Sequence, residues 1–367
     1  MHIAFFGSSL VSAFWNGAAT YYRGMLSALA RRGHTITFYE PDAFDRQKHR
    51  DMDPPDWARV VVWPATQEGC ERALEDAKGA DLVVKASGVG VFDAFLEQNV
   101  LRLKAPGTRV VLWDVDAPAT LENIHTSPDD VLGPLVPDFD MVLTYGGGDP
   151  VVDAYTKLGA KACVPIYNAL DPTTHYPVEP DPAFAADLAF LGNRLPDREA
   201  RVEEFFLKAA QVLPDQRFLM GGSGWDDKPM PSNVRNLGHV YTHQHNAFNC
   251  SPKAVLNITR DSMAKTGFSP PTRVFEACGA GACLVTDAWE GIDQFLEPGR
   301  EVLVAHDGED VARQLSSLSE TEAAAVGQAG LARVLAEHTY DHRAAEVEAL
   351  LEGSDRVAPV TPEEVAS

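Results

Sequence analysis

The feature that most constrains this chain is an alternation of short apolar segments with amphipathic helical stretches. Most of the short segments are β-branched and apolar on both faces, as in strands that helices cover on two sides of a parallel sheet. In the first half the predicted strands are His2–Phe6, Thr35–Tyr39, Val60–Trp63, Leu82–Lys85, Arg109–Trp113, Met141–Thr144 and Ala162–Ile166. The predicted helices are Ala18–Arg31, Gln67–Ala77, Val91–Leu103 and Pro150–Leu158. This order predicts a doubly wound α/β domain.

The alternation stops and then restarts. Residues 168–183 are rich in proline and acidic side chains and have no periodic apolar pattern, which predicts a linker. Beyond it the predicted strands are Asp187–Leu191, Arg217–Met220, Ala254–Ile258, Cys283–Thr286 and Glu301–Val304, and the predicted helices are Arg198–Val212, Thr321–Glu337 and Arg343–Leu351. We therefore expect two Rossmann-like domains with doubly wound parallel sheets, residues 1–167 and 184–353, followed by a frayed tail at 354–367. Ligands of such sheets bind at the carboxyl ends of the strands, so a central cleft between the domains is expected.

The composition disfavours several kinds of partner. The net charge of −22 repels nucleic-acid backbones and anionic membrane surfaces. No apolar run approaches the roughly 20 residues that cross a bilayer, and the N-terminus reads as a strand rather than a signal peptide. Five cysteines without a CxxC pair fit reduced thiols. We expect a cytoplasmic protein with no nucleic-acid partner and no membrane insertion.

The most informative segment is a loop that leads through two prolines into a helix. Pro270 and Pro271 suit a helix entry, which predicts a helix at Thr272–Gly279. Its free amides and dipole can bind a phosphate, Arg273 can add a charge-assisted contact, and Glu276 can accept hydrogen bonds from both hydroxyls of a ribose. A plain helix-loop-strand with a solvated glutamate is the alternative. The predicted nucleotide-binding residues of this segment are Gly267, Phe268, Ser269, Thr272, Arg273 and Glu276.

This segment, continued to Ala305, resembles the donor-binding half of GT-B glycosyltransferases, and more narrowly the CgeB-like family of spore maturation proteins. The resemblance extends to Gly7–Leu10, Trp15–Gly24, Trp113–Pro118 and Tyr167–Pro172, and so covers the chain to about Val311. It implies the GT-B architecture and a hexosyltransferase-type enzyme. Such an enzyme moves a sugar from a nucleotide-diphosphate sugar to an unidentified acceptor without a metal. Phe268 stands where retaining GT-B enzymes often carry a second glutamate, which leaves retention or inversion open.

The resemblance also gives roles to residues outside that segment. It places Arg194, and as a second candidate Arg198, beside the donor diphosphate, although both can equally be surface arginines. It places Asn16 and Gly17 beside the acceptor and the donor's β-phosphate, while Asn16 can instead cap the first helix. Gly222 belongs to a glycine-rich loop that allows a close approach of the donor, and turn geometry explains this loop at least as well.

Two carboxylates are candidates for the catalytic base. Asp114 and Asp116 follow a predicted strand, and one of them can take the proton of the acceptor hydroxyl. Capping and loop hydrogen bonds are the alternative, and an Asp-x-Asp metal site of the GT-A kind is a weaker one. His239, His243 and His245 form a histidine-rich loop, but no cysteine or carboxylate stands at a spacing that favours a metal, so no metal site is predicted.

Two other functions share this fold. A nucleotide-sugar epimerase would need acid and base groups on both faces of the sugar and no acceptor. A non-catalytic nucleotide- or sugar-binding protein would bind the donor without turnover. A nicotinamide-dependent oxidoreductase is disfavoured, because the first turn reads Gly7-Ser8-Ser9 and not GxGxxG.

Overall fold

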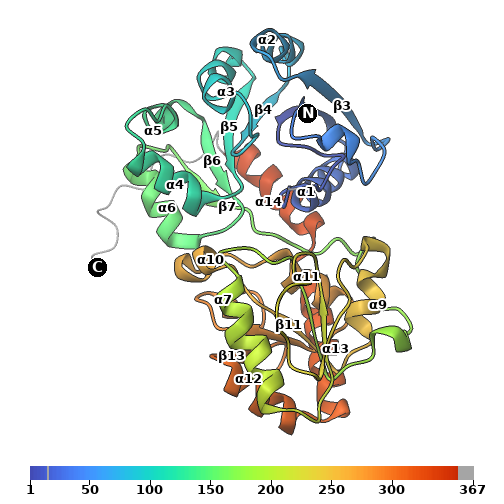
Figure 1. Ribbon diagram of the computed structural model, residues 1–367. Helices are drawn as coiled ribbons and strands as arrows, with labels where there is room; N and C mark the ends of the chain where they lie inside the picture. Colours follow the sequence, from blue (N-terminus) through green and yellow to red (C-terminus); the bar gives the residue numbers. More distant parts are fainter. Residues whose placement is uncertain (15, 354–367) are drawn as a thin grey trace.

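The computed structural model describes residues 1–14 and 16–353, and it shows two α/β halves, one above the other in Figure 1. The first half is built on a seven-stranded sheet in the order β3-β2-β1-β4-β5-β6-β7, in which all neighbouring strands are parallel. Its strands are β1 (His2–Phe6), β2 (Thr35–Asp42), β3 (Ala58–Pro64), β4 (Leu82–Ala86), β5 (Arg109–Asp114), β6 (Met141–Thr144) and β7 (Cys163–Pro165). The predicted α/β class, with two doubly wound parallel sheets, is confirmed.

The second half repeats this plan on a six-stranded parallel sheet in the order β10-β9-β8-β11-β12-β13. Its strands are β8 (Leu188–Leu191), β9 (Phe218–Gly221), β10 (Val234–Asn236), β11 (Ala254–Asn257), β12 (Leu284–Asp287) and β13 (Leu303–Ala305). In both halves the order reverses beside the first strand, β1 or β8, and this reversal opens a crevice at the carboxyl edge of each sheet.

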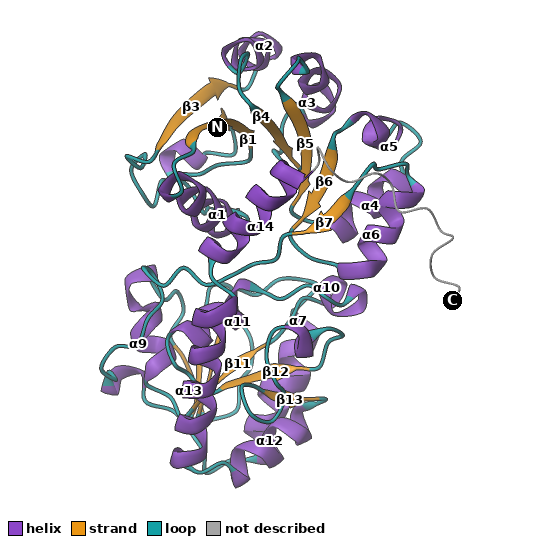
Figure 2. Ribbon diagram, turned by 180° about the vertical axis from the view of Figure 1, so that it is seen from behind, coloured by secondary structure: helices purple, strands orange, loops and turns teal. Residues whose placement is uncertain are grey.

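Helices cover both faces of each sheet, so the strands between them are almost wholly apolar (Figure 2). The first half carries α1 (Ala19–Arg31), α2 (Gln67–Asp76), α3 (Asp93–Val100), α4 (Ala117–Thr126), α5 (Leu132–Leu135) and α6 (Gly148–Lys157). The second half begins with α7 (Glu199–Val202) and α8 (Lys208–Val212), which a π-helical turn at Glu203–Leu207 joins into one helix. It continues with α9 (His245–Cys250), α10 (Asp261–Thr266), α11 (Thr272–Gly279), α12 (Gly308–Ser317), α13 (Glu320–Glu337) and α14 (Tyr340–Gly353).

The last helix returns to the first half, which corrects the expectation that residues 184–353 form one domain. Tyr340, Ala344, Val347 and Leu351 of α14 are buried in the core beneath the first sheet. The chain crosses twice between the halves, and the two crossings pair at Leu170 and Thr339. Leu170 donates to His338 O at 2.8 Å, and Tyr340 donates to Leu170 O at 3.0 Å. The C-terminal helix therefore ties the two halves together.

A second contact between the halves lies beside α10 (Figure 1). Gly147 N donates to Phe268 O at 2.8 Å, and the Tyr145 hydroxyl lies 3.7 Å from Met263 Sδ. The predicted linker packs on the second half, since Asn168 Nδ2 donates to Pro270 O at 3.1 Å and Asn246 Nδ2 donates to Thr174 O at 3.0 Å. Trp15 and the predicted tail at 354–367 lie outside the described residues. Among the helices that the structure describes, none is long and apolar enough to cross a bilayer.

Candidate functional site

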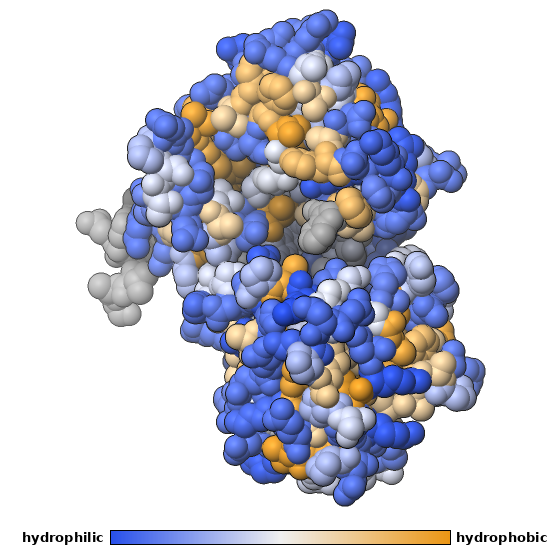
Figure 3. Space-filling model, viewed as in Figure 1, coloured by the Kyte–Doolittle hydropathy of each residue, from blue (hydrophilic) through white to orange (hydrophobic). Residues whose placement is uncertain are grey.

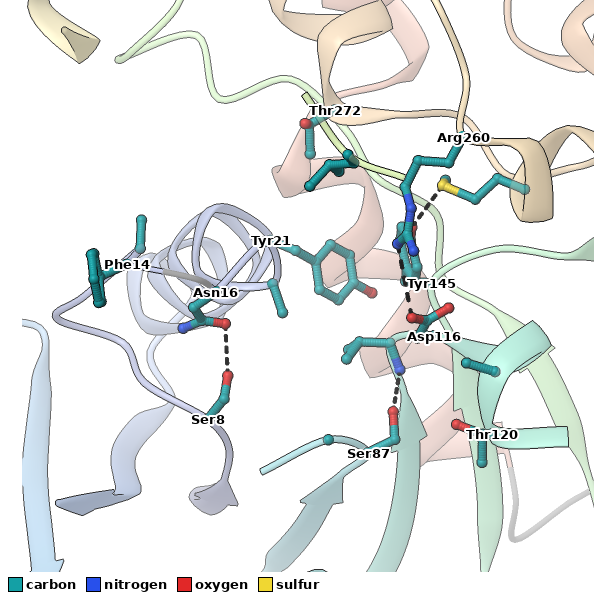
Figure 4. Close-up of a pocket in the computed structure, with 18 of the residues that line it drawn as sticks. Ser8, Phe14, Asn16, Tyr21, Ser87, Asp116, Thr120, Tyr145, Arg260 and Thr272 are labelled. Atoms are coloured by element: carbon teal, nitrogen blue, oxygen red, sulfur yellow. Dashed lines mark hydrogen bonds and ion pairs between the residues drawn. The ribbon is translucent and has the colours of Figure 1, made fainter. Parts of the chain in front are cut away.

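A cleft of about 1740 Å³ separates the two halves, and side chains of both halves line it. The face shown in Figure 3 is largely hydrophilic and is hollowed between the upper and lower halves. Figure 4 shows Ser8, Asn16, Ser87 and Asp116 on one side of this cleft, and Arg260 and Thr272 on the other. The carboxyl ends of β1, β4 and β5 lie on the first side and those of β8 and β11 on the second, as the strand order of both sheets predicts.

The second half offers a cationic pocket at the N-terminus of α11. Thr272 and Arg198 line both the large cleft and an adjoining cavity of about 180 Å³, which Arg273 also lines. Arg198 forms no ion pair with a described carboxylate, and its Nε is buried without a hydrogen-bond partner. Burial lowers the pKa of Arg198, and the nearby Arg260 and Arg273 lower it further. An anion bound here would relieve the cost of desolvating this half-buried charge.

Glu276 lies one turn into α11, and its side chain is 14% exposed. Its Oε2 lies 3.7 Å from Arg273 Nη1. Burial by itself would raise the pKa of Glu276, but Arg273 and the rings of His175 and His245 lower it, so the carboxylate is charged at neutral pH. Arg273 Nη1, His175 Nε2 and His245 Nδ1 are buried without a hydrogen-bond partner. These groups surround a carboxylate that retains its capacity to accept hydrogen bonds.

The loop before α11 supports the helix entry rather than the cleft. Phe268 adopts a φ of +47°, its N–H donates to Glu290 O, and its ring packs where side chains at Gly148 and Gly291 would stand. Ser269 is buried, and its hydroxyl donates to Gly267 O at 2.9 Å. Gly267, Phe268 and Ser269 do not line the cleft, so they position the helix and join the two halves.

Arg194 lines the cleft, but its charge is already neutralised. Its guanidinium donates to Glu199 Oε1 at 2.7 Å and to Asp227 Oδ1 at 2.8 Å. Gly222 lies behind the cleft lining with a φ of +124°, and a Cβ there would stand 2.2 Å from Gly192 O. Turn geometry and close backbone packing therefore account for Gly222.

The two candidate bases occupy different environments. Asp114 is fully buried and accepts hydrogen bonds from four donors: the Tyr155 hydroxyl at 2.5 Å, Ser87 Oγ at 2.6 Å, Thr120 Oγ1 at 2.9 Å and Asp116 N at 3.0 Å. It does not line the cleft. Asp116 lines the cleft, and its side chain is 47% exposed. Its Oδ2 lies 4.0 Å from Arg260 Nη1. Burial raises the pKa of Asp116, although Arg260 opposes the shift.

On the first half, Asn16 and Gly17 line the cleft just before α1. The Asn16 side chain does not cap the helix. It accepts from Ser8 Oγ at 2.8 Å and donates to Ser9 O and Ser12 O, which fixes the loop after β1. The alternative prediction that Asn16 caps the helix is wrong.

The residues of the histidine-rich loop lie in two different places. His239 and Tyr241 line the cleft with their rings 4.7 Å apart, whereas His245 lies inward beside Glu276. Within the described residues, no three His, Cys, Asp or Glu side chains are grouped so that they could hold a metal ion.

Sequence reasoning missed Arg46, Tyr145 and His175. Arg46 and Tyr145 follow the carboxyl ends of β2 and β6, so the rule for parallel sheets would have found them. His175 lies in the predicted linker and has no signal in the sequence, because only the fold brings it to Glu276.

Comparisons with known proteins agree with this architecture. Residues 198–349, which include α11, match the family model described as "Glycosyl transferase-like". No curated protein sequence matches the chain. Sucrose-phosphate synthase from Thermosynechococcus elongatus has a similar structure, with a TM-score of 0.67, 16% identity and coverage of 96% of this chain and 98% of that chain.

Two further structures extend the comparison. The Anabaena protein HepE, in complex with UDP and glucose, has a TM-score of 0.65 at 14% identity and covers 96% of this chain and 100% of its own. T4 phage BGT, in complex with its UDP-glucose substrate, has a TM-score of 0.56 at 12% identity over 97% of this chain and 100% of its own. The chain has the GT-B fold. The match to the glycosyl transferase-like family model lies within the second half and its C-terminal helix, and α11 falls within the matched residues.

Proposed function

We propose that the protein is a glycosyltransferase that moves a sugar, of the hexose type, from a nucleotide-diphosphate sugar to an acceptor. The observation that carries the proposal is the pocket at the N-terminus of α11. There Arg198, which is half-buried and forms no ion pair with a described carboxylate, lies next to free helix amides, and Glu276 follows one turn further on. The glycosyl transferase-like family match and the UDP and UDP-glucose complexes of HepE and BGT support a UDP-sugar as the first donor to try. The finer CgeB-like resemblance stays a prediction.

The chemistry follows from the charges on each side of the cleft. The departing nucleoside diphosphate gains negative charge as the glycosidic bond breaks, and Arg198, Arg273 and the α11 amides stabilise that charge where a metal ion would otherwise do so. Glu276 accepts hydrogen bonds from the ribose. Asp116, on the acceptor side, takes the proton of the attacking hydroxyl. Closure of the two halves over the donor would exclude water, which would otherwise hydrolyse it.

Calorimetric titration with UDP, GDP, ADP, CDP and dTDP tests the donor site. We expect one nucleotide to bind selectively in the presence of EDTA, and Glu276→Gln to weaken it by about tenfold. Glu179→Gln, which changes an exposed glutamate of the linker, is the matched control and should bind as the wild type does. If a folded sample binds no nucleotide, the assignment of the donor site is wrong.

Turnover separates the transferase from the other functions of this fold. A transferase consumes the nucleotide-sugar in step with a glycosylated acceptor. An epimerase instead yields a new nucleotide-sugar without any acceptor, and a binding protein leaves the donor intact. Either of those two results would contradict the proposal.

A further inference from the structure

The first half of the cleft contains a buried cation whose side chain donates only to backbone carbonyls among the described residues. Arg46 follows β2, is 7% exposed and lines the cleft. Its Nη1 donates to Ser8 O at 3.3 Å and to Val89 O at 3.4 Å, and its Nε is buried without a hydrogen-bond partner. Within the described chain it forms no ion pair. Burial lowers the pKa of Arg46, which is the sign of a charge that lacks solvation.

The backbone just before Arg46 adopts an unfavourable conformation. Phe44 and Asp45, the two residues before it, have φ angles of +55° and +56°, a region that residues other than glycine seldom adopt. The Phe44 ring lies 5.0 Å from the Arg46 guanidinium carbon, in a cation–π contact. Strain of this kind is concentrated at binding sites, where the surrounding structure fixes a functional side chain.

The neighbouring carboxylates are already engaged. Asp93 and Glu97 share the buried Lys85 Nζ at 2.6 and 2.9 Å. The fully buried Glu40 accepts from Ser9 Oγ, Leu10 N and Gln47 Nε2. Glu40 raises the pKa of Arg46 and so offsets part of the effect of burial, but no described carboxylate forms an ion pair with Arg46 and its Nε has no partner. A direct anionic partner for this guanidinium can therefore come from a ligand.

The N-terminus of α1 adds a second set of donors in the same half. This helix of 13 residues has no side-chain cap and no acidic residue in its first turn. In the described part of the chain, the N–H groups of Gly17, Ala18 and Tyr21, three residues that line the cleft, donate to no protein acceptor. Ser8 links the two features, because its carbonyl accepts from Arg46 and its hydroxyl donates to Asn16 just before α1. A Cβ at Gly17 would meet no atom within 4 Å, so there is room for a side chain at this position.

We propose that Arg46 and the free amides of α1 form an anion subsite, and that the acceptor of this protein carries an acidic group, a phosphate or a carboxylate. The subsite belongs to the half of the cleft that faces α11, so an acceptor anchored there presents a hydroxyl to Asp116 between the halves. The class of acceptor rests on the proposed function, whereas the anion subsite itself does not. A neutral sugar or alcohol would leave both Arg46 and the helix amides unpaired.

Anion titration of the UDP-saturated protein tests the subsite, because bound UDP occupies the donor phosphate site. Inorganic phosphate and acetate are titrated separately at constant ionic strength, and the one that binds more tightly names the acidic group. We expect Arg46→Gln to weaken that binding by about tenfold or more, since a charge-assisted hydrogen bond is lost. Arg50→Gln, on the same segment, changes an exposed arginine that donates only to Gln47 in the described structure and serves as the control.

Gly17→Asp covers the case in which Arg46→Gln fails to fold. The new carboxylate has room, and a negative charge at a helix N-terminus favours folding, yet it occupies the anion subsite. Arg46→Gln should bind UDP as tightly as the wild type, whereas Gly17→Asp is compared for anion binding alone, because Gly17 is also a candidate neighbour of the donor's β-phosphate. The proposal is overturned if neither anion binds, if both variants bind it normally, or if the UDP affinity of Arg46→Gln falls together with its anion affinity, since the site would then hold the donor. If UDP fails to bind the wild type, the donor proposal falls, and the same titration without UDP still decides the subsite.

Discussion

Asp114 and Asp116 stand two residues apart on one segment, yet burial gives them different tasks. Four donors converge on Asp114, so its carboxylate organises β4, β5 and α6 from inside. Asp116 faces the cleft and keeps its acceptor capacity for a substrate. The sequence predicted the pair as candidates, but a spacing of two cannot tell which member is buried.

Replacing Asp116 tests the base. We expect Asp116→Asn to lower kcat by about 10²–10⁴-fold without weakening UDP binding, because a proton acceptor is lost but no donor contact is. In the wild type, burial raises the pKa of Asp116, and only the ionised form accepts a proton. The rate should therefore fall as the pH drops through that raised pKa. Unchanged turnover in Asp116→Asn would eliminate the assignment.

Asp114→Asn is the companion change, with the opposite result. The amide nitrogen cannot accept a hydrogen bond, so at least one buried hydroxyl loses its partner, which costs about 2 kcal/mol of unfolding free energy. Urea denaturation should show this loss. Asp116→Asn, at a half-exposed side chain that donors do not surround, should unfold close to wild type. A wild-type unfolding curve for Asp114→Asn would show that the network is dispensable.

The two arginines after β8 provide another contrast at this scale. Arg198→Gln should weaken UDP binding by about tenfold or more, because its half-buried guanidinium forms no ion pair with a described carboxylate and is free to pair with a phosphate. Arg194→Gln should change UDP affinity little, because Glu199 and Asp227 already hold its guanidinium. Isothermal calorimetry on both variants shows which of the two arginines contributes more to UDP affinity. Equal effects would mean that Arg194 leaves its partners when the donor binds.

At the scale of elements, the prediction from sequence was best where the hydrophobic period was strong. Strands β1 and β6 and helix α11 have the predicted bounds, because buried parallel strands and a proline-led helix have clear local signals. Short elements such as β10, α9 and α10 were missed, since three to six residues show no period. The helix α12 was also missed, although Asp307 caps it.

The return of α14 could not be predicted, because it depends on tertiary packing. Its apolar side chains fit a helix on either sheet, and the sequence does not say which sheet they cover. In the structure, Tyr340 lies against Gly24 of α1, where a side chain would collide with the ring. The glycine in the middle of α1 was the one local trace of this contact, since glycine lowers helix stability unless close packing requires it.

That contact gives a prediction about packing. A Cβ at residue 24 would stand 2.1 Å from Tyr340 Cε2, so we expect Gly24→Ala to lower the unfolding free energy by about 1–3 kcal/mol. In a Tyr340→Ala background the same change should cost less, because the obstructing ring is gone. Gly353→Ala, at the end of α14 with open space around it, is the control. If Gly24→Ala lowered the unfolding free energy equally in both backgrounds, its effect would not come from the contact with α14.

At the scale of the whole molecule, the net charge of −22 and the cationic groups of the cleft have to be reconciled. Most arginines at the surface are paired with acids, as Arg32 is with Glu348 and Arg59 with Asp76. Arg46 is buried and Arg198 is half-buried, one in each half of the cleft, and neither forms an ion pair among the described residues. The acidic surface keeps polyanions away, while two local cations remain for small anionic ligands that fit between the halves.

The crossing between the halves makes stability depend on pH. His338 is 6% exposed, its Nδ1 accepts from Arg343 Nη2 at 2.9 Å, and its ring packs against Phe275 and Phe295. Burial, and then the charges of Arg343 and Arg333, lower the pKa of His338 to about 4. The unfolded chain has a histidine pKa of about 6.5. Between these values the unfolded chain binds the proton first, so stability is full above about pH 6.5 and falls as the pH drops toward 4.

His338→Asn should remove that part of the pH dependence, because the amide oxygen still accepts from Arg343 but does not titrate. We expect the wild type to lose up to about 3 kcal/mol of unfolding free energy through this group between pH 6.5 and 4, and the variant to lose correspondingly less. Urea denaturation across this range measures the difference. His125→Asn, at an exposed histidine of α4, should keep the wild-type slope. If His338→Asn also keeps that slope, the acid sensitivity of the molecule lies elsewhere than at the crossing of its two halves.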